Sequence, residues 1–115
     1  MEIGILEKKV RLTALYDLYQ GLLTDKQSEV LRHYCDLDES ISEIAEQFEI
    51  SRQAVHESIR KVEKMLERHE TKLGFYERIR GYEATLSEIG SIAASNAMPE
   101  QTRAAIRKLL EPYDI

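Results

Sequence analysis

The residues with the clearest chemical potential form a basic stretch in the middle of the chain. Residues 51–68 hold five bases and three acids, although the whole chain has a formal net charge of −5. On a helix that begins after Ser51, a step of about 100° per residue places most of these polar side chains opposite Val55. We call the candidate set the basic face; its members are Arg52, Gln53, His56, Arg60, Lys61, Lys64 and Arg68. Glutamine pairs well with adenine, arginine with guanine and lysine with phosphate, so the types predict a nucleic-acid site.

An acidic stretch lies directly before the basic one and opposes that interpretation. Residues 38–50 carry five acids and no base. Glu43, Glu46 and Glu49 would lie on the helix that crosses the DNA backbone, where they would repel phosphates. The same carboxylates suit a basic protein partner. We therefore keep a partner site at these three residues as an expectation, and the basic face could equally be a solvated surface or bind structured RNA.

The pattern does not indicate catalysis or metal binding. The chain has no glycine-rich phosphate loop. His33 and Cys35 are two residues apart on a predicted helix and point in different directions, and no second ligand pair follows. The three histidines make no nucleophile–base pair with Cys35. A lone cysteine of this kind is most often a small residue of the core. We expect neither an enzyme nor a metal or other cofactor.

The elements that would position the basic face form a helix–turn–helix pattern. Ser40, with Glu43 three residues later, predicts the start of one helix, and Ser51 predicts the start of the next. Ile50 lies in the turn between them and is expected to fill the core. The apolar residues that would pack the two helices together are Ile44, Ala45, Phe48, Val55 and Ile59. The motif spans residues 40–66.

Helical periodicity extends over the whole chain and predicts an all-α fold. Helices are expected at about residues 3–20, from Thr24 to residue 35 or 36, from Ser51 to a cap at Gly74, from residue 75 to 93, and from near Pro99 to 110. Residues 1–73 are expected to form a helical domain that contains the helix–turn–helix, and residues 74–115 a C-terminal helical extension.

Apolar residues in two places exceed what one small core needs. The first helix has Ile3, Leu6 and Val10 on one side and Leu12, Leu15, Tyr16, Tyr19 and Leu22 mostly on another. A second apolar stripe, which we call the seam, consists of Phe75, Ile79, Tyr82, Leu86, Ile89 and Ala93. We expect a homodimer or higher oligomer with one of these surfaces at the contact. The alternative is a monomer whose seam folds back on the first helix.

Length and composition bound the class of protein. The chain has 115 residues, of which 43% are hydrophobic and 32% charged, and this excludes collagen and low-complexity disorder. No apolar run approaches the roughly 18 residues of a membrane helix, and no signal peptide is evident. The single cysteine cannot form an internal disulfide. These features predict a soluble, cytoplasmic protein without membrane insertion.

Residues 12–66 resemble the YlxM family of bacterial helix–turn–helix proteins. The pieces that carry the resemblance are Leu15-Tyr16-Asp17-Leu18-Tyr19, Leu22-Leu23-Thr24-Asp25-Lys26-Gln27, Glu43-Ile44-Ala45-Glu46-Gln47-Phe48 and Ile50-Ser51-Arg52-Gln53-Ala54-Val55. The same region is similar to region four of sigma factors, in which Leu-Thr-x-x-Gln precedes the motif. The chain from Gly81 onward matches no motif of its own.

The resemblance implies a fold and a role. The fold would be an all-α helix–turn–helix core, winged-helix-like or sigma-region-four-like, with an extended helical C-terminal part. Because genes of this family stand beside those of the signal recognition particle, the implied role is a regulatory or accessory protein of that pathway. Its partner would then be the particle's protein or RNA. The alternative is a sequence-specific transcriptional regulator that binds duplex DNA.

Overall fold

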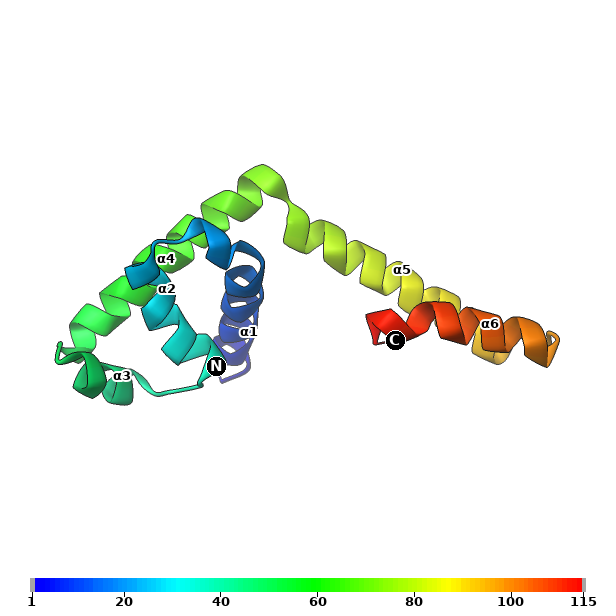
Figure 1. Ribbon diagram of the computed structural model, residues 1–115, viewed down its shortest axis with the longest axis horizontal. Helices are drawn as coiled ribbons and strands as arrows, with labels where there is room; N and C mark the ends of the chain where they lie inside the picture. The colour runs from blue at the N-terminus through cyan, green and yellow to red at the C-terminus, as the bar shows by residue number, and fades with distance from the viewer. Residues whose placement is uncertain (1, 115) are drawn as a thin grey trace. The chain divides into compact units, whose positions relative to one another are not determined.

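The computed structural model describes residues 2–114, with side chains from residue 4 onward, and its regular elements there are helices (Figure 1). They are α1 (Glu2–Tyr19), α2 (Asp25–Leu31), α3 (Ile41–Phe48), α4 (Arg52–Leu73), α5 (Phe75–Ser95) and α6 (Glu100–Leu110). Short 3-10 turns follow α1 and α6, and a π-helical turn, Arg32–Asp36, follows α2. Residues 2–114 contain no strand, so the all-α prediction is confirmed and the helix–turn–helix has no β-wing.

The chain divides into two compact units, one ending at Tyr76 and the other beginning at Glu77. The first unit contains α1 to α4 and the first two residues of α5. The second contains the rest of α5 and α6. The expected division into a helical domain of residues 1–73 and a C-terminal extension of residues 74–115 stays a prediction.

Side-chain caps explain where the helices of the first unit begin. The Thr24 side chain accepts from the Gln27 backbone N–H at 3.3 Å, and the Gln27 side chain accepts from the Thr24 N–H at 3.0 Å. Ser40 and Glu43 form the same reciprocal capping box at 3.1 and 3.2 Å. Ser51 caps α4 through the Ala54 N–H. Each cap satisfies backbone donors that the helix leaves unpaired, and the capping predictions are confirmed.

The core of the first unit joins α1 to the C-terminal half of α4. Leu12, Leu15, Tyr16 and Tyr19 are buried on one side of α1 against Val62 and Leu66, and Leu31 closes the cluster. The other apolar side of α1 is exposed, since Leu6 and Val10 are 63% and 65% exposed. Ile3 lies outside the described side chains. Leu22, expected on the buried side, is also exposed because it lies in the 3-10 turn after α1.

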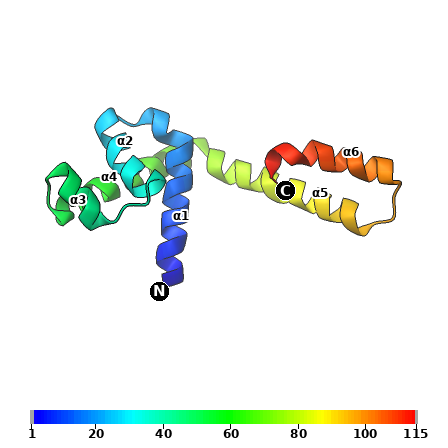
Figure 2. The same ribbon diagram turned by 60° about the horizontal axis from the view of Figure 1, so that its bottom comes forward.

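A second cluster packs α3 against the N-terminal half of α4 and confirms the helix–turn–helix. Ile44 and Val55 are fully buried, Ala45 lies where the helices meet, and Val30 of α2 completes the cluster. Figure 2 shows α3 beside the start of α4. The expectation for Ile50 is wrong: its side chain is 41% exposed. Glu49 takes the left-handed conformation that ends α3, and Ile50, the next residue, belongs to neither core cluster.

A buried carboxylate fixes the end of α4. Gly74 has φ of 64° and ends the helix as predicted, because a left-handed residue favours glycine. The Tyr19 hydroxyl donates to Glu70 Oε1 at 2.6 Å, and the Tyr76 backbone N–H donates to the same oxygen at 3.0 Å. The Phe75 N–H donates to the Tyr19 hydroxyl at 3.3 Å. The first turn of α5 is therefore bound to α1 and α4.

The second unit is an antiparallel hairpin of α5 and α6 (Figure 2). Arg103 of α6 donates to the carbonyls of Ala93 at 3.1 Å and Asn96 at 2.8 Å, which satisfies acceptors at the end of α5. Ala93 and Leu110 are the apolar side chains described as buried here. Several apolar side chains of this unit remain exposed, namely Ile79, Tyr82, Ile89, Ile92, Leu109 and Tyr113.

Candidate nucleic-acid interface

The helix α4 carries the basic face on the side opposite its buried stripe. Val55, Val62 and Leu66 are at most 2% exposed and fix the rotation of the helix. As a result, the predicted members of the basic face are all exposed: Arg52, Gln53, His56, Arg60, Lys61, Lys64 and Arg68. The helix is 22 residues long and begins at the turn of the motif, so these side chains follow one continuous surface.

The cations of the basic face are available to a ligand. Among the described residues, none of the five arginines and lysines of this face lies within ion-pair distance of a carboxylate. The amide of Gln53 makes a long contact of 3.5 Å to Glu57. A phosphate or base edge that approached this surface would not have to displace an internal salt bridge.

Arg11 of α1 binds Glu67, a carboxylate on the same helix as the basic face. Its Nε donates to Glu67 Oε1 at 2.7 Å and its Nη2 donates to Oε2 at 2.9 Å, which is a bidentate pair. The hydrogen bond from Arg11 lowers the pKa of the Glu67 carboxyl. The guanidinium also lies 5.3 Å from the ring centre of Tyr76. This pair is not predictable from the sequence, because its members are 56 positions apart and no local pattern connects them.

The three acids proposed as a partner site lie on or beside α3, and all are exposed. Glu43 also has a structural task, since its carboxylate accepts from the Ser40 N–H in the capping box. Glu49 ends the helix with φ of 55°. Glu46 lines a shallow, open hollow together with Arg52. The acidic and basic predicted sites therefore meet at the turn of the motif.

His33 and Cys35 have structural environments of different kinds. His33 Nδ1 lies 2.9 Å from Glu39 Oε2, and its ring meets Phe48 edge to face. Gln47 donates to the same Glu39 oxygen at 2.8 Å, so the group ties the π-helical turn after α2 to α3. Cys35 packs against the core, and burial raises the pKa of its thiol. The part of the chain described holds no cluster of three side chains that suits a metal ion.

No helix in residues 2–114 is both long enough and apolar enough to cross a bilayer.

Comparison with known proteins identifies the family. Residues 6–106 match the family described as "Putative helix-turn-helix protein, YlxM / p13 like". A UPF0122 protein of Bacillus pumilus is 38% identical over 104 residues, which cover 90% of this chain and 94% of that protein. A UPF0122 protein of Geobacillus kaustophilus is 53% identical over 79 residues, covering 66% and 72%. The likeness extends beyond the resemblance seen at residues 12–66 and includes α5. The chain therefore belongs to the UPF0122 family of YlxM/p13-like helix–turn–helix proteins.

Proposed function

We propose that this protein is a cytoplasmic regulatory protein that binds duplex DNA through the basic face of α4. The observation that supports the proposal best is the set of cations on the exposed side of the second helix of the motif, which lie beyond ion-pair distance of any carboxylate in residues 4–114. In helix–turn–helix complexes that helix enters the major groove, and its N-terminal residues contact base edges. The packing of α3 on α4 gives the rigid support that such a reading helix needs.

The length of α4 divides the basic face into two parts. From Arg52 to Arg68 the helix rises about 24 Å, roughly twice the width of the major groove. Gln53 and Arg60 are therefore assigned to base edges, with adenine and guanine as the matching bases. Lys61, Lys64 and Arg68 are assigned to phosphates. Glu46 and Glu49 weaken the attraction to phosphates. Because the lysine and arginine contacts to phosphates release counterions, affinity is expected to fall as salt rises.

A homo-oligomer fits this role. Dimeric helix–turn–helix proteins bind two half-sites about 34–36 Å apart on one side of the duplex. The exposed apolar side chains of α1 and of the second unit offer surface for self-association, as exposed patches of this kind often do. The target would then be a sequence with two-fold symmetry.

Selection from random duplexes at low salt, followed by fluorescence anisotropy, tests DNA binding. Arg60→Ala is expected to lose about 1–3 kcal/mol on the preferred sequence and to relax its specificity. Lys64→Ala should weaken binding to all duplexes similarly and lower the salt slope by about one ion. Lys72→Ala, on the same helix but outside the basic face, is the matched control. Absence of binding at low salt, or affinity unchanged by both substitutions, contradicts the proposal.

A second candidate is an accessory role in the signal recognition particle pathway, with contact to the particle's protein or RNA. It is favoured by the exposed carboxylates Glu43, Glu46 and Glu49, which suit a basic protein surface better than a phosphate backbone. Capture from a cell lysate with and without nuclease separates the candidates. Nuclease-resistant recovery of the particle's protein, lost in Glu46→Lys, supports the accessory role. Recovery of neither the protein nor the RNA of the particle contradicts it.

A further inference from the structure

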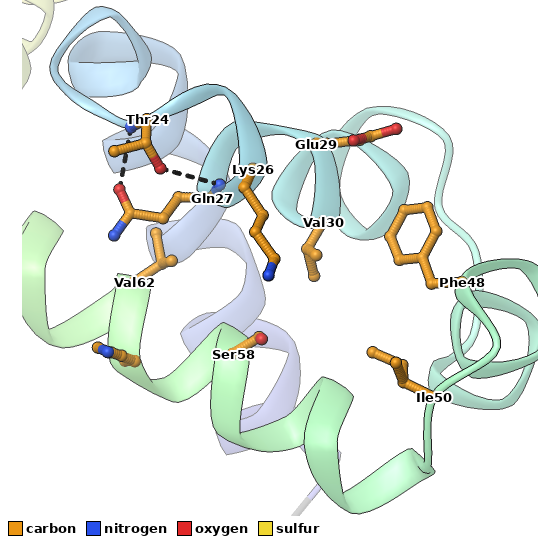
Figure 3. Close-up of a pocket in the computed structure, with 10 residues that line it drawn as sticks. Thr24, Lys26, Gln27, Glu29, Val30, Phe48, Ile50, Ser58 and Val62 are labelled. Atoms are coloured by element: carbon orange, nitrogen blue, oxygen red, sulfur yellow. Dashed lines mark hydrogen bonds between the residues drawn. The ribbon is translucent and has the colours of Figure 1, made fainter.

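A hollow of about 580 Å³ opens between α2, the turn of the helix–turn–helix and α4 (Figure 3). Its volume falls within the range of about 300–1,000 Å³ that is usual for small-molecule sites. All the residues that line it belong to the first unit. Its walls come from three elements that the two apolar clusters hold in fixed positions. The hollow is therefore a preformed feature of the helix–turn–helix unit.

One end of the hollow is apolar. Val30 of α2 faces Phe48 and Ile50 across the open space, as Figure 3 shows. Ile50 is the residue that the core does not take up, and its side chain is 41% exposed. An apolar group placed here would cover Ile50 and the accessible part of Phe48 and remove both from water, which favours binding.

The other end of the hollow presents hydrogen-bond donors. In Figure 3 the Lys26 side chain extends toward Ser58 of α4, while the Glu29 carboxylate points away from the space. Neither Lys26 nor Lys61, the second lysine in the lining, lies within ion-pair distance of a carboxylate in the described chain. The Gln27 oxygen already accepts from the Thr24 N–H, so that amide offers its NH2 group. The polar end therefore offers its two cations to an acceptor on a ligand.

We propose that this hollow binds a small amphipathic carboxylate, with its apolar body at Val30, Phe48 and Ile50 and its carboxylate at Lys26 and Lys61. Charge complementarity selects this class. A neutral apolar molecule would make no ion pair with the two exposed lysines, and a bare inorganic anion would leave Ile50 in water. A carboxylate with an apolar body meets both needs at once.

The site has a consequence for the basic face. Lys61 belongs both to the hollow and to the basic face. A bound carboxylate would neutralise this cation and so weaken contact with a phosphate. This consequence alone rests on the proposed function; occupation of the hollow does not depend on it.

The binding test uses the full chain, amide NMR spectra and 4-phenylbutyrate as the probe. The matched control is 4-phenylbutanamide, which keeps the shape and removes the charge. Saturable shifts are expected for amides of residues 24–30 and 48–62, with a dissociation constant on the order of 1 mM for a ligand of this size. The neutral amide should bind about tenfold more weakly, because a hydrogen bond to a charged group is lost. Equal binding of acid and amide, or no saturable shift, overturns the proposal.

Two substitutions locate the carboxylate. Lys26→Gln removes a cation from the polar end and is expected to weaken the probe about tenfold. Lys72→Gln removes an exposed cation of the same unit that does not line the hollow, and should leave binding unchanged. Unchanged circular dichroism shows that both variants keep the fold. Equal weakening of probe binding by the two substitutions, or no weakening by either of them, contradicts the assignment. Competition of the probe with duplex DNA is a separate measurement, so a failure of DNA binding leaves the ligand test intact.

Discussion

The carboxylate of Glu70 is buried where α4 ends and α5 begins, with 7% of the residue exposed. Tyr19→Phe removes the hydroxyl that donates to it and that also accepts from Phe75. A hydrogen bond to a charged group typically contributes about 1.5–3 kcal/mol, and we expect the free energy of unfolding to fall by that amount. Urea denaturation measures it. Tyr113→Phe, at an exposed tyrosine, is the control and should change little; equal effects of both substitutions would contradict the role of Glu70.

The buried tyrosines also predict an effect of alkaline pH. Burial raises the pKa of Tyr19 and of Tyr16 above the usual value near 10. Between the unfolded and the raised folded pKa, the unfolded chain binds fewer protons, so the stability that these tyrosines contribute is complete below about pH 10 and falls as pH rises further. Burial also raises the pKa of Cys35, so its contribution to stability falls with rising pH as well. Denaturation series at several pH values should show a shallower decline in Tyr19→Phe than in the parent. Identical slopes would contradict the expectation for Tyr19.

Pairs such as Arg11 with Glu67 and Tyr19 with Glu70 mark the limit of prediction at the residue scale. Their members are 56 and 51 positions apart, and both pairs form only because α1 packs along α4. Helical periodicity shows which side of each helix is buried, but it does not show which charged side chains meet at the edge of the contact. The basic face could be listed from spacing alone because its members share one helix.

The helices themselves were predictable because their start signals are local. Thr24, Ser40 and Ser51 each bond to a backbone N–H three residues later, so a short sequence pattern contains the whole interaction. The π-helical turn after α2 had no such signal. Ile50 was misplaced because hydrophobicity predicts burial but does not show whether a residue in a turn reaches the core, and Ile50 belongs to neither core cluster.

Ser40→Ala tests the cap that begins the helix–turn–helix. Loss of the side-chain acceptor for the Glu43 N–H is expected to lower the free energy of unfolding by about 1 kcal/mol. Thermal or urea denaturation followed by circular dichroism measures the change. Ser42→Ala, an exposed serine within the first turn of the same helix, is the matched control and should be near neutral. A larger loss at Ser42 than at Ser40 would contradict the assignment of the cap.

At the scale of the whole molecule, apolar surface remains outside the cores of both units. On α1, Ile5, Leu6 and Val10 are each more than 60% exposed, and on α5, Tyr82 is 62% exposed. The second unit is a pair of helices, and two helices alone bury too little apolar surface to be stable without further contacts. Exposed patches of this kind usually mark an interface in a protein of this size. Self-association through the seam or through α1 therefore remains our expectation.

Sedimentation velocity at tens of micromolar checks this expectation. The chain has a mass of 13.3 kDa, and we expect a particle of at least twice that mass. Ile89→Glu places a charge on an exposed position of the seam, and Leu6→Glu does the same on α1, so neither disturbs a core. Whichever variant dissociates the particle identifies the contact, because burying an unpaired carboxylate in an apolar interface is costly. Ser91→Glu, exposed on the side of α5 opposite the seam, is the control and should keep the mass of the parent. A parent particle of 13.3 kDa would contradict the oligomer and favour a monomer.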